Sequence, residues 1–228
     1  MSLTVRREVV EVCRRLYDRG LIAGPDGNVS VRLAPDRLLV TPTGMSKVDV
    51  GVDDLVEVSL AGAYRRGARR ASSELAVHLK VYQRRADVQA VVHAHPPVAT
   101  GFAVAGEGFS QCVLPEVIFQ VGWVPLVPYD TPGTPDLAER FEPWVATHDA
   151  FLMANHGAVT VGSTLSVAHQ RMESLEHTAR ILLTARLLGR VNELSSAHVA
   201  ALEQARVGAG GAGVYPGCPM PADRRGNP

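Results

Sequence analysis

The chain has 228 residues, of which 46% are hydrophobic and 20% are charged, a composition typical of globular proteins and not of disordered or fibrous ones. Its 23 basic and 23 acidic residues cancel, so no overall charge favours nucleic acid or an anionic membrane surface. No apolar run approaches the roughly 18 residues of a membrane span, and the N-terminal segment is charged where a signal peptide is apolar, so we expect a cytoplasmic protein that binds neither nucleic acid nor membrane.

The predicted elements alternate between helices and short strands along the chain. The first is a helix over 4–19, where apolar residues recur at helical spacing until Gly20 ends it. The β-branched run before His93, bounded by Asp87 and Pro96, predicts a buried strand. In chain order we expect strands at 28–33, 37–41, 55–60, 88–93, 124–127, 150–155 and 158–161, and helices at 4–19, 72–85, 97–104, 136–147, 165–188 and 196–206.

These elements predict a single α/β domain. Strands occur in hairpins as well as between helices, which favours a mixed, largely antiparallel sheet over a doubly wound parallel one. No repeat or linker divides the chain before residue 208, where glycine and proline begin to dominate. We therefore predict a domain over 1–207 and a tail over 208–228 that is ordered only where something holds it.

Three histidines form a candidate metal site. His93 and His95 lie two residues apart at a predicted strand end, so both side chains point to the same face. His156 precedes Gly157 between two short strands, where a turn can project it into the same space. Three histidines and an open fourth position are the ligand set of a catalytic zinc site. An isolated H-x-H pair is more often structural, and spacing alone does not decide between these interpretations.

Glu74 opens the predicted helix 72–85, directly after Ser72 and Ser73. A carboxylate in a first helical turn is stabilised by the helix dipole, so one interpretation is a capping residue. The other is a general base or acid beside a metal. His78, one helical turn later, we interpret as structural.

Three small polar clusters offer hydroxyl, amide or backbone N–H donors. They are Asn28 in G-N-V-S, Thr43-Gly44 in T-P-T-G, and Ser72-Ser73. The last lies at a predicted helix N-terminus, which binds anions readily. Together they predict a phosphate pocket with little full positive charge, and nearby Lys47 has no assigned role.

In this order the motifs resemble those of the class II aldolase/adducin family. The chain carries G-N-V-S-V-R, T-P-T-G, S-S-E, V-V-H-A-H, P-Y-x-x-P-G-T and N-H-G-A, and the resemblance runs from about residue 4 to 206. It implies a three-layer α/β/α domain, assembled as a homotetramer with active sites between subunits. It also implies a metal-dependent aldolase that cleaves a small phosphorylated ketose, similar to L-fuculose 1-phosphate. The products would be dihydroxyacetone phosphate and an aldehyde, formed through a zinc-stabilised enediolate.

The resemblance also implies roles for individual residues. His93, His95 and His156 match the zinc ligands, although imidazole suits Mn²⁺, Co²⁺ and Fe²⁺ as well. Glu74 matches the catalytic glutamate that moves the proton at the donor carbon. The positions that hold the substrate phosphate are matched by Asn28, Thr43, Gly44, Ser72 and Ser73.

Two positions depart from the family pattern at the aldehyde end of the substrate. Where the fuculose-cleaving enzyme has a tyrosine, this chain reads L-P-E-V, so either Glu116 replaces it or the acid comes from elsewhere. Tyr215 matches loosely a C-terminal tyrosine that closes over the site, and its alternative is a residue of a disordered tail.

These departures leave other functions open. A sugar-phosphate 4-epimerase, dehydratase or decarboxylase of the same superfamily would share the metal histidines and differ in its acid and base. A non-catalytic, adducin-like binding module is disfavoured, because such modules lack the metal histidines and this chain keeps all three together with Glu74.

Overall fold

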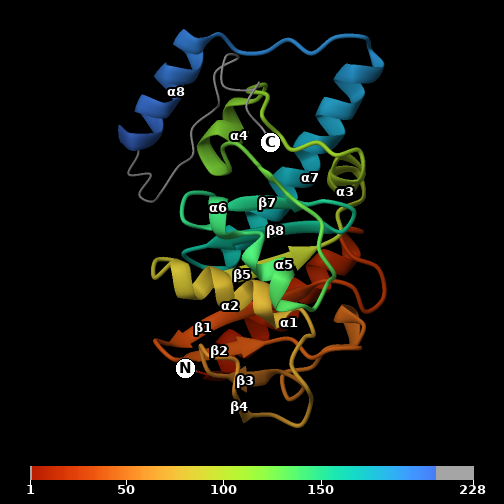
Figure 1. The fold of residues 1–228 in the computed structure, drawn as a ribbon, viewed down its shortest axis with the longest axis vertical. Helices are drawn as coiled ribbons and strands as arrows, with labels where there is room; N and C mark the ends of the chain where they lie inside the picture. The colour runs from red at the N-terminus through yellow and green to blue at the C-terminus, as the bar shows by residue number, and fades with distance from the viewer. Residues whose placement is uncertain (1, 209–228) are drawn as a thin grey trace.

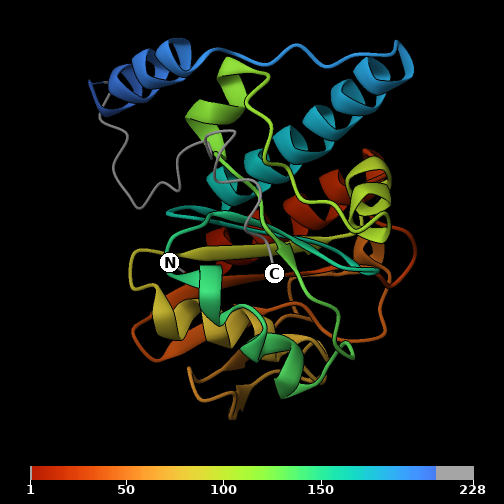
Figure 2. The same cartoon turned by 45° about the horizontal axis from the view of Figure 1, so that its top comes forward.

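The computed structural model describes residues 2–208, and these form one sheet of eight strands between layers of helices (Figures 1 and 2). The strands are β1 (Asn28–Ala34), β2 (Arg37–Val40), β3 (Val56–Val58), β4 (Tyr64–Arg66), β5 (Ala90–Ala94), β6 (Leu126–Val127), β7 (Ala150–Met153) and β8 (Gly157–Gly162). Their order in the sheet is β4-β3-β2-β1-β5-β8-β7-β6. All neighbours pair antiparallel except β6 and β7, which are parallel. The predicted mixed, largely antiparallel sheet is confirmed.

Helices cover both faces of this sheet, as Figure 2 shows. One layer contains α1 (Ser2–Asp18), α3 (Pro97–Val104) and α7 (Leu165–Leu187), and the other contains α2 (Leu75–Arg84), α5 (Pro135–Glu139) and α6 (Glu142–Val145). Beyond the sheet, α4 (Pro115–Gln120) packs against α8 (Ser196–Gly208), and a 3-10 helix, η1 (Lys47–Asp49), follows β2. Among residues 2–208 we find no helix with the length and apolarity to cross a membrane.

The central strand β5 supplies side chains to both cores. Val92 and Ala94 are buried in the core under α1 and α7, whereas Val91 lies in the core under α2. Side chains alternate along a strand, so His93 shares the α2 face with Val91. An imidazole in this position is buried among apolar neighbours and therefore needs hydrogen-bonding or metal partners.

Several element boundaries differ from those expected. The helix predicted over 136–147 consists of the two short helices α5 and α6, because Pro143 in the first turn of α6 lacks the N–H that a continuous helix needs. The helix predicted from residue 72 begins at Leu75, and Glu74 is its N-cap residue. The short edge strand β4 and the six-residue α4 are absent from the prediction, since neither is long enough to show a clear apolar period.

Candidate metal centre and active site

The three histidines predicted to bind metal converge at the end of β5. His93 lies in β5, His95 follows it, and His156 lies in the turn between β7 and β8. One ring nitrogen of each lies within 4.8 Å of the other two, and Nε2 of His93 is 3.1 Å from Nε2 of His95. The three imidazoles are therefore close enough to bind one ion.

The protonation states of two of these rings suit metal binding. His93 is 2% exposed, and its Nδ1 lies 2.9 Å from the carbonyl oxygen of Ala158. A carbonyl oxygen only accepts, so the proton is on Nδ1 and the Nε2 lone pair remains free for a metal. Burial, together with the nearby His93 and His156 rings, lowers the pKa of His95 to about 4, so that ring is neutral at neutral pH.

Close packing around Gly157 fixes the turn that carries His156. Asn155 has a φ of 54°, a left-handed conformation that asparagine tolerates better than most residues. A Cβ on residue 157 would lie 2.6 Å from the carbonyl oxygen of Ala94 and 2.6 Å from Cδ2 of His95. The glycine of the N-H-G motif therefore allows β8 to lie directly against the histidine strand.

We expect Gly157→Ala to weaken metal binding and to lower the free energy of unfolding by about 1–3 kcal/mol, the usual cost of overpacking. The matched control is Gly101→Ala, because a Cβ on Gly101 in α3 meets no atom within 4 Å. That control should be neutral or stabilising by up to about 1 kcal/mol. Denaturant unfolding and metal titration measure both effects, and wild-type values for Gly157→Ala would refute the packing argument.

The Glu74 side chain lies among the histidines and does not cap its helix. Although Glu74 is the N-cap residue of α2, its side chain makes no capping hydrogen bond. One carboxylate oxygen accepts a hydrogen bond from Nδ2 of Asn28 at 2.8 Å and lies 2.9 Å from Nε2 of His93. The other lies 3.0 Å from Nε2 of His156. The geometry therefore disfavours the capping interpretation of Glu74 and places its carboxylate beside the three histidines.

The charges at this carboxylate favour a bound cation. Burial opposes ionisation of Glu74, but the hydrogen-bonding contacts with His156 and His93 outweigh burial and hold its pKa well below the ordinary value. A hydrogen bond from His93 Nε2 to this carboxylate needs a second proton on the ring, because Nδ1 already carries one; in the neutral ring, the Nε2 lone pair faces the carboxylate oxygen at 2.9 Å. Two acceptors this close are stable only with a proton or a cation beside them. The three histidines and Glu74 therefore fit a divalent metal.

Backbone hydrogen bonds join the segments predicted to bind phosphate. The Thr41 N–H donates to the carbonyl of Val29 at 3.0 Å, and the Thr41 carbonyl accepts from the Ser72 N–H at 3.1 Å. The Thr43 N–H donates to the carbonyl of Arg70, also at 3.1 Å. The T-P-T-G loop thus lies between the start of β1 and the S-S-E turn. The residues predicted to bind phosphate therefore lie in adjoining segments: Asn28, Thr43, Gly44, Ser72 and Ser73.

Of the two residues predicted for the aldehyde end, Glu116 is described by the structure and does not join this site within the single chain. Glu116 is exposed on α4, and no hydrogen bond or ion pair within residues 2–208 joins it to Glu74 or to the metal histidines. In the view of Figure 2, α4 lies above the sheet and α2 lies below it. Tyr215 lies outside the described residues.

Sequence reasoning missed some polar neighbours of the site. Asp26 has a carboxylate oxygen 3.4 Å from Nδ1 of His95. The signal that could have identified Asp26 is its position in the turn directly before β1. Ser30 Oγ lies 2.6 Å from Nδ1 of His78 and 2.9 Å from the Tyr82 hydroxyl. Burial lowers the pKa of His78 to about 3, an environment suited to a neutral, structural ring.

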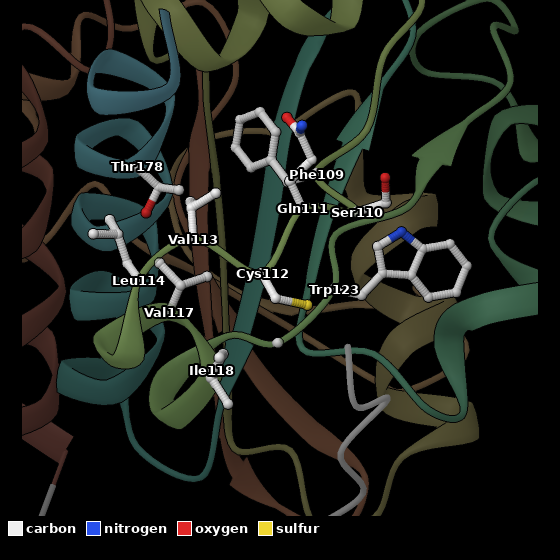
Figure 3. A pocket seen from close by; sticks show the side chains of 11 residues that line it. Phe109, Ser110, Gln111, Cys112, Val113, Leu114, Val117, Ile118, Trp123 and Thr178 are labelled. Atoms are coloured by element: carbon white, nitrogen blue, oxygen red, sulfur yellow. The ribbon is translucent and has the colours of Figure 1, made fainter. Parts of the chain in front are cut away.

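Two hollows offer candidate sites. One is a narrow hollow lined by two of the three histidines, His93 and His156, together with Asn28, Glu74 and His78 among others. The other, with a cavity volume of about 10 Å³, lies between α4, α7 and the segment before α4 (Figure 3). The described residues that line it include Cys112, Trp123 and Thr178 but no histidine, carboxylate or cationic side chain. Of these two hollows, the first has the groups that acid–base or metal chemistry requires.

Comparisons with known proteins agree with this geometry. Residues 7–183 match the family model of the class II aldolase and adducin N-terminal domain. The chain is 35% identical over 187 residues to the 3-oxo-tetronate 4-phosphate decarboxylase of Haemophilus influenzae, covering 80% of this chain and 89% of that protein. It is 34% identical over 181 residues to the L-fuculose phosphate aldolase of Methanococcus maripaludis, covering 79% and 96%. A solved structure of L-fuculose 1-phosphate aldolase superposes with a TM-score of 0.83 at 28% identity, covering 89% and 95%.

Proposed function

The chain belongs to the class II aldolase and adducin family, and on this basis we propose that it is a metal-dependent lyase that cleaves a carbon–carbon bond in a small phosphorylated sugar derivative. The observation that carries the proposal is the Glu74 carboxylate, which lies within 3.0 Å of two of the three histidines. A half-buried carboxylate beside three imidazoles suits catalysis and has no evident use in a non-catalytic binding module.

His93, His95 and His156 would hold the metal, and we propose Zn²⁺ as that ion. A bound divalent ion supplies Lewis acidity that draws electrons from the substrate carbonyl and so favours the enediolate left when the bond breaks. Glu74 would take and return the proton at the donor carbon. Asn28 would keep that carboxylate in place through its hydrogen bond. The donors at Asn28, Thr43, Gly44, Ser72 and Ser73 would hold the phosphate and so supply binding energy remote from the reacting bond.

The first candidate reaction is aldol cleavage of a ketose 1-phosphate to dihydroxyacetone phosphate and an aldehyde. This reaction needs a group that takes the proton from the hydroxyl at the aldehyde end. We propose that Glu116, and Tyr215 from the tail, serve this end from a neighbouring subunit of a homotetramer, because Glu116 is exposed on α4 in the single chain. A fully active monomer at nanomolar concentration would contradict this assembly.

The second candidate reaction is decarboxylation of a 3-oxo sugar-acid phosphate. The relative from Haemophilus influenzae favours it, since its name assigns that reaction to a protein 35% identical to this chain. Loss of CO₂ also leaves an enediolate but needs no base at an aldehyde end. The histidines and Glu74 of a single chain therefore supply the groups that decarboxylation needs. Aldol cleavage needs a further group at the aldehyde end.

A substrate panel tests the proposal. Ketose 1-phosphates and 3-oxo-tetronate 4-phosphates are supplied to the metal-loaded protein, and release of an aldehyde and of CO₂ is measured in parallel, because both reactions leave dihydroxyacetone phosphate as the other fragment. We expect one of the two products, and we expect a chelator to abolish its formation because the histidines then lose their ion. Product release that survives the chelator, or release of neither product from any substrate, would contradict the proposed function.

A further inference from the structure

Lys47 is a buried cation in the loop that follows T-P-T-G. Its side chain is 2% exposed, and its Nζ donates hydrogen bonds to the carbonyl oxygens of Pro25 at 2.8 Å and Met45 at 3.0 Å. Within residues 2–208, no ion pair joins Lys47 to a carboxylate. An ammonium group has three donors, so two are used on neutral partners and its charge has no direct counter-charge.

The other lysine of the chain shows how unusual this is. Lys47 and Lys80 are the only lysines of the chain, whose other side chains with a permanent positive charge are arginines. The Nζ of Lys80 lies 2.7 Å from a carboxylate oxygen of Glu139 and 3.1 Å from one of Glu142. The charge of Lys80 is therefore neutralised by two carboxylates. The charge of Lys47 has no such partner, so its electrostatic potential extends to the neighbouring groups.

The hydrogen bonds of Lys47 connect two loops of the candidate phosphate site. Met45 follows Gly44 directly, and the Pro25 carbonyl belongs to the turn that leads into Asn28. The Lys47 N–H also donates to the carbonyl of Gly24, at 3.4 Å. One side chain thus fixes the T-P-T-G loop against the turn before β1, and with it the relative positions of the donors on both segments.

The charge of Lys47 also reaches the site. Burial lowers the pKa of Lys47, while the nearby carboxylates of Asp26 and Glu74 act in the opposite direction. The loop itself is open to a ligand, because Gly44 has a φ of +67° and a Cβ built on it meets no atom within 4 Å. The amide, hydroxyl and N–H donors assigned to the phosphate carry no formal charge, so a phosphate dianion bound there needs a cation nearby.

We propose that Lys47 is a positioning residue for the phosphate group of the substrate, which holds the Thr43-Gly44 loop in place and supplies the positive charge that the bound dianion requires. This inference rests on the proposed function for its substrate class. It predicts that phosphate binding and the Lys47 charge stabilise each other, since each provides the counter-charge that the other lacks.

The test uses Lys47→Met, which keeps the length of the side chain and removes its charge, in the full metal-loaded chain. We expect the affinity for inorganic phosphate to fall about 10- to 100-fold, the value of a hydrogen bond or ion contact to a charged group. The KM should rise by a similar factor while kcat and metal content change little. The matched control, Lys80→Met, should bind phosphate as the wild type does. Wild-type phosphate affinity in Lys47→Met would overturn the proposal.

A second measurement on the wild type covers the case in which Lys47→Met does not fold. Lysine labelled with carbon-13 at Cε gives two NMR signals, and Lys80→Met assigns them. Saturating inorganic phosphate should shift the Lys47 signal and leave the Lys80 signal in place. An unmoved Lys47 signal would overturn the proposal. Wild type that binds phosphate with this shift but releases no product from the substrate panel would instead contradict the proposed reaction and leave the role of Lys47 standing.

Discussion

Glu74→Gln is expected to lower turnover by about 10²–10⁴-fold, the usual contribution of a general acid–base group. Glutamine keeps the shape of the side chain and an oxygen that can accept the hydrogen bond from Asn28, but it cannot accept a proton from the substrate. We therefore expect the variant to keep its fold and its metal. Exchange of solvent deuterium into the donor carbon of dihydroxyacetone phosphate measures this step separately from cleavage, and it should be lost together with turnover.

The comparison variant is Glu116→Gln, which should keep deuterium exchange even where cleavage slows, because Glu116 is not joined to the histidine cluster in the chain. If Glu74 only stabilised the start of α2, Glu74→Gln would cost at most about 1 kcal/mol of stability and leave exchange intact. Exchange at the wild-type rate in Glu74→Gln would therefore show that the proposed proton transfer is wrong.

His93→Ala is expected to reduce bound metal from about one ion per chain to a small fraction of that, and to lower activity by more than about 10²-fold. The imidazole is removed from the buried β5 strand, and the carbonyl of Ala158 loses its donor at the same time. Elemental analysis of the purified variant measures the metal directly. Circular dichroism shows whether the sheet has survived.

The control for this variant is His177→Ala, since His177 is exposed on α7 and is outside the group of three. It should keep full metal content and activity. The double variant His93→Ala/His95→Ala gives the sharpest result, because only His156 would remain of the three imidazoles. Full metal occupancy in that double variant would refute the assignment of the site.

Much of the sheet and the histidine cluster could be predicted because each depends on local sequence. The alternation around Val91 and His93, and the turn glycine at position 157, constrain their own segments directly. The contacts that decide the role of Glu74 were not predictable in the same way. They join residues from β1, β5 and the turn before β8, and nothing in the S-S-E motif itself indicates those partners.

Lys47 shows the same limit more strongly. Its partners are carbonyl groups, which every residue has, so no pattern of side chains identifies them. Its burial likewise depends on how two loops fold over one another. The division of helix 136–147 was, by contrast, available from Pro143, and the prediction overlooked it.

The location of the site in the sheet has a consequence for how new activities arise in such a chain. The histidine cluster and Glu74 depend on the adjacent central strands β1, β5 and β8. Every residue of β5 and β8 is buried, so changes there disturb the whole domain. Glu116 lies on α4, outside the sheet, where substitutions have little effect on those strands. If Glu116 handles the departing fragment as proposed, mutation can alter that group while the electron-accepting half of the proposed reaction stays intact. A fold with this division of labour can change its leaving group from an aldehyde to CO₂ by few substitutions, all at its periphery.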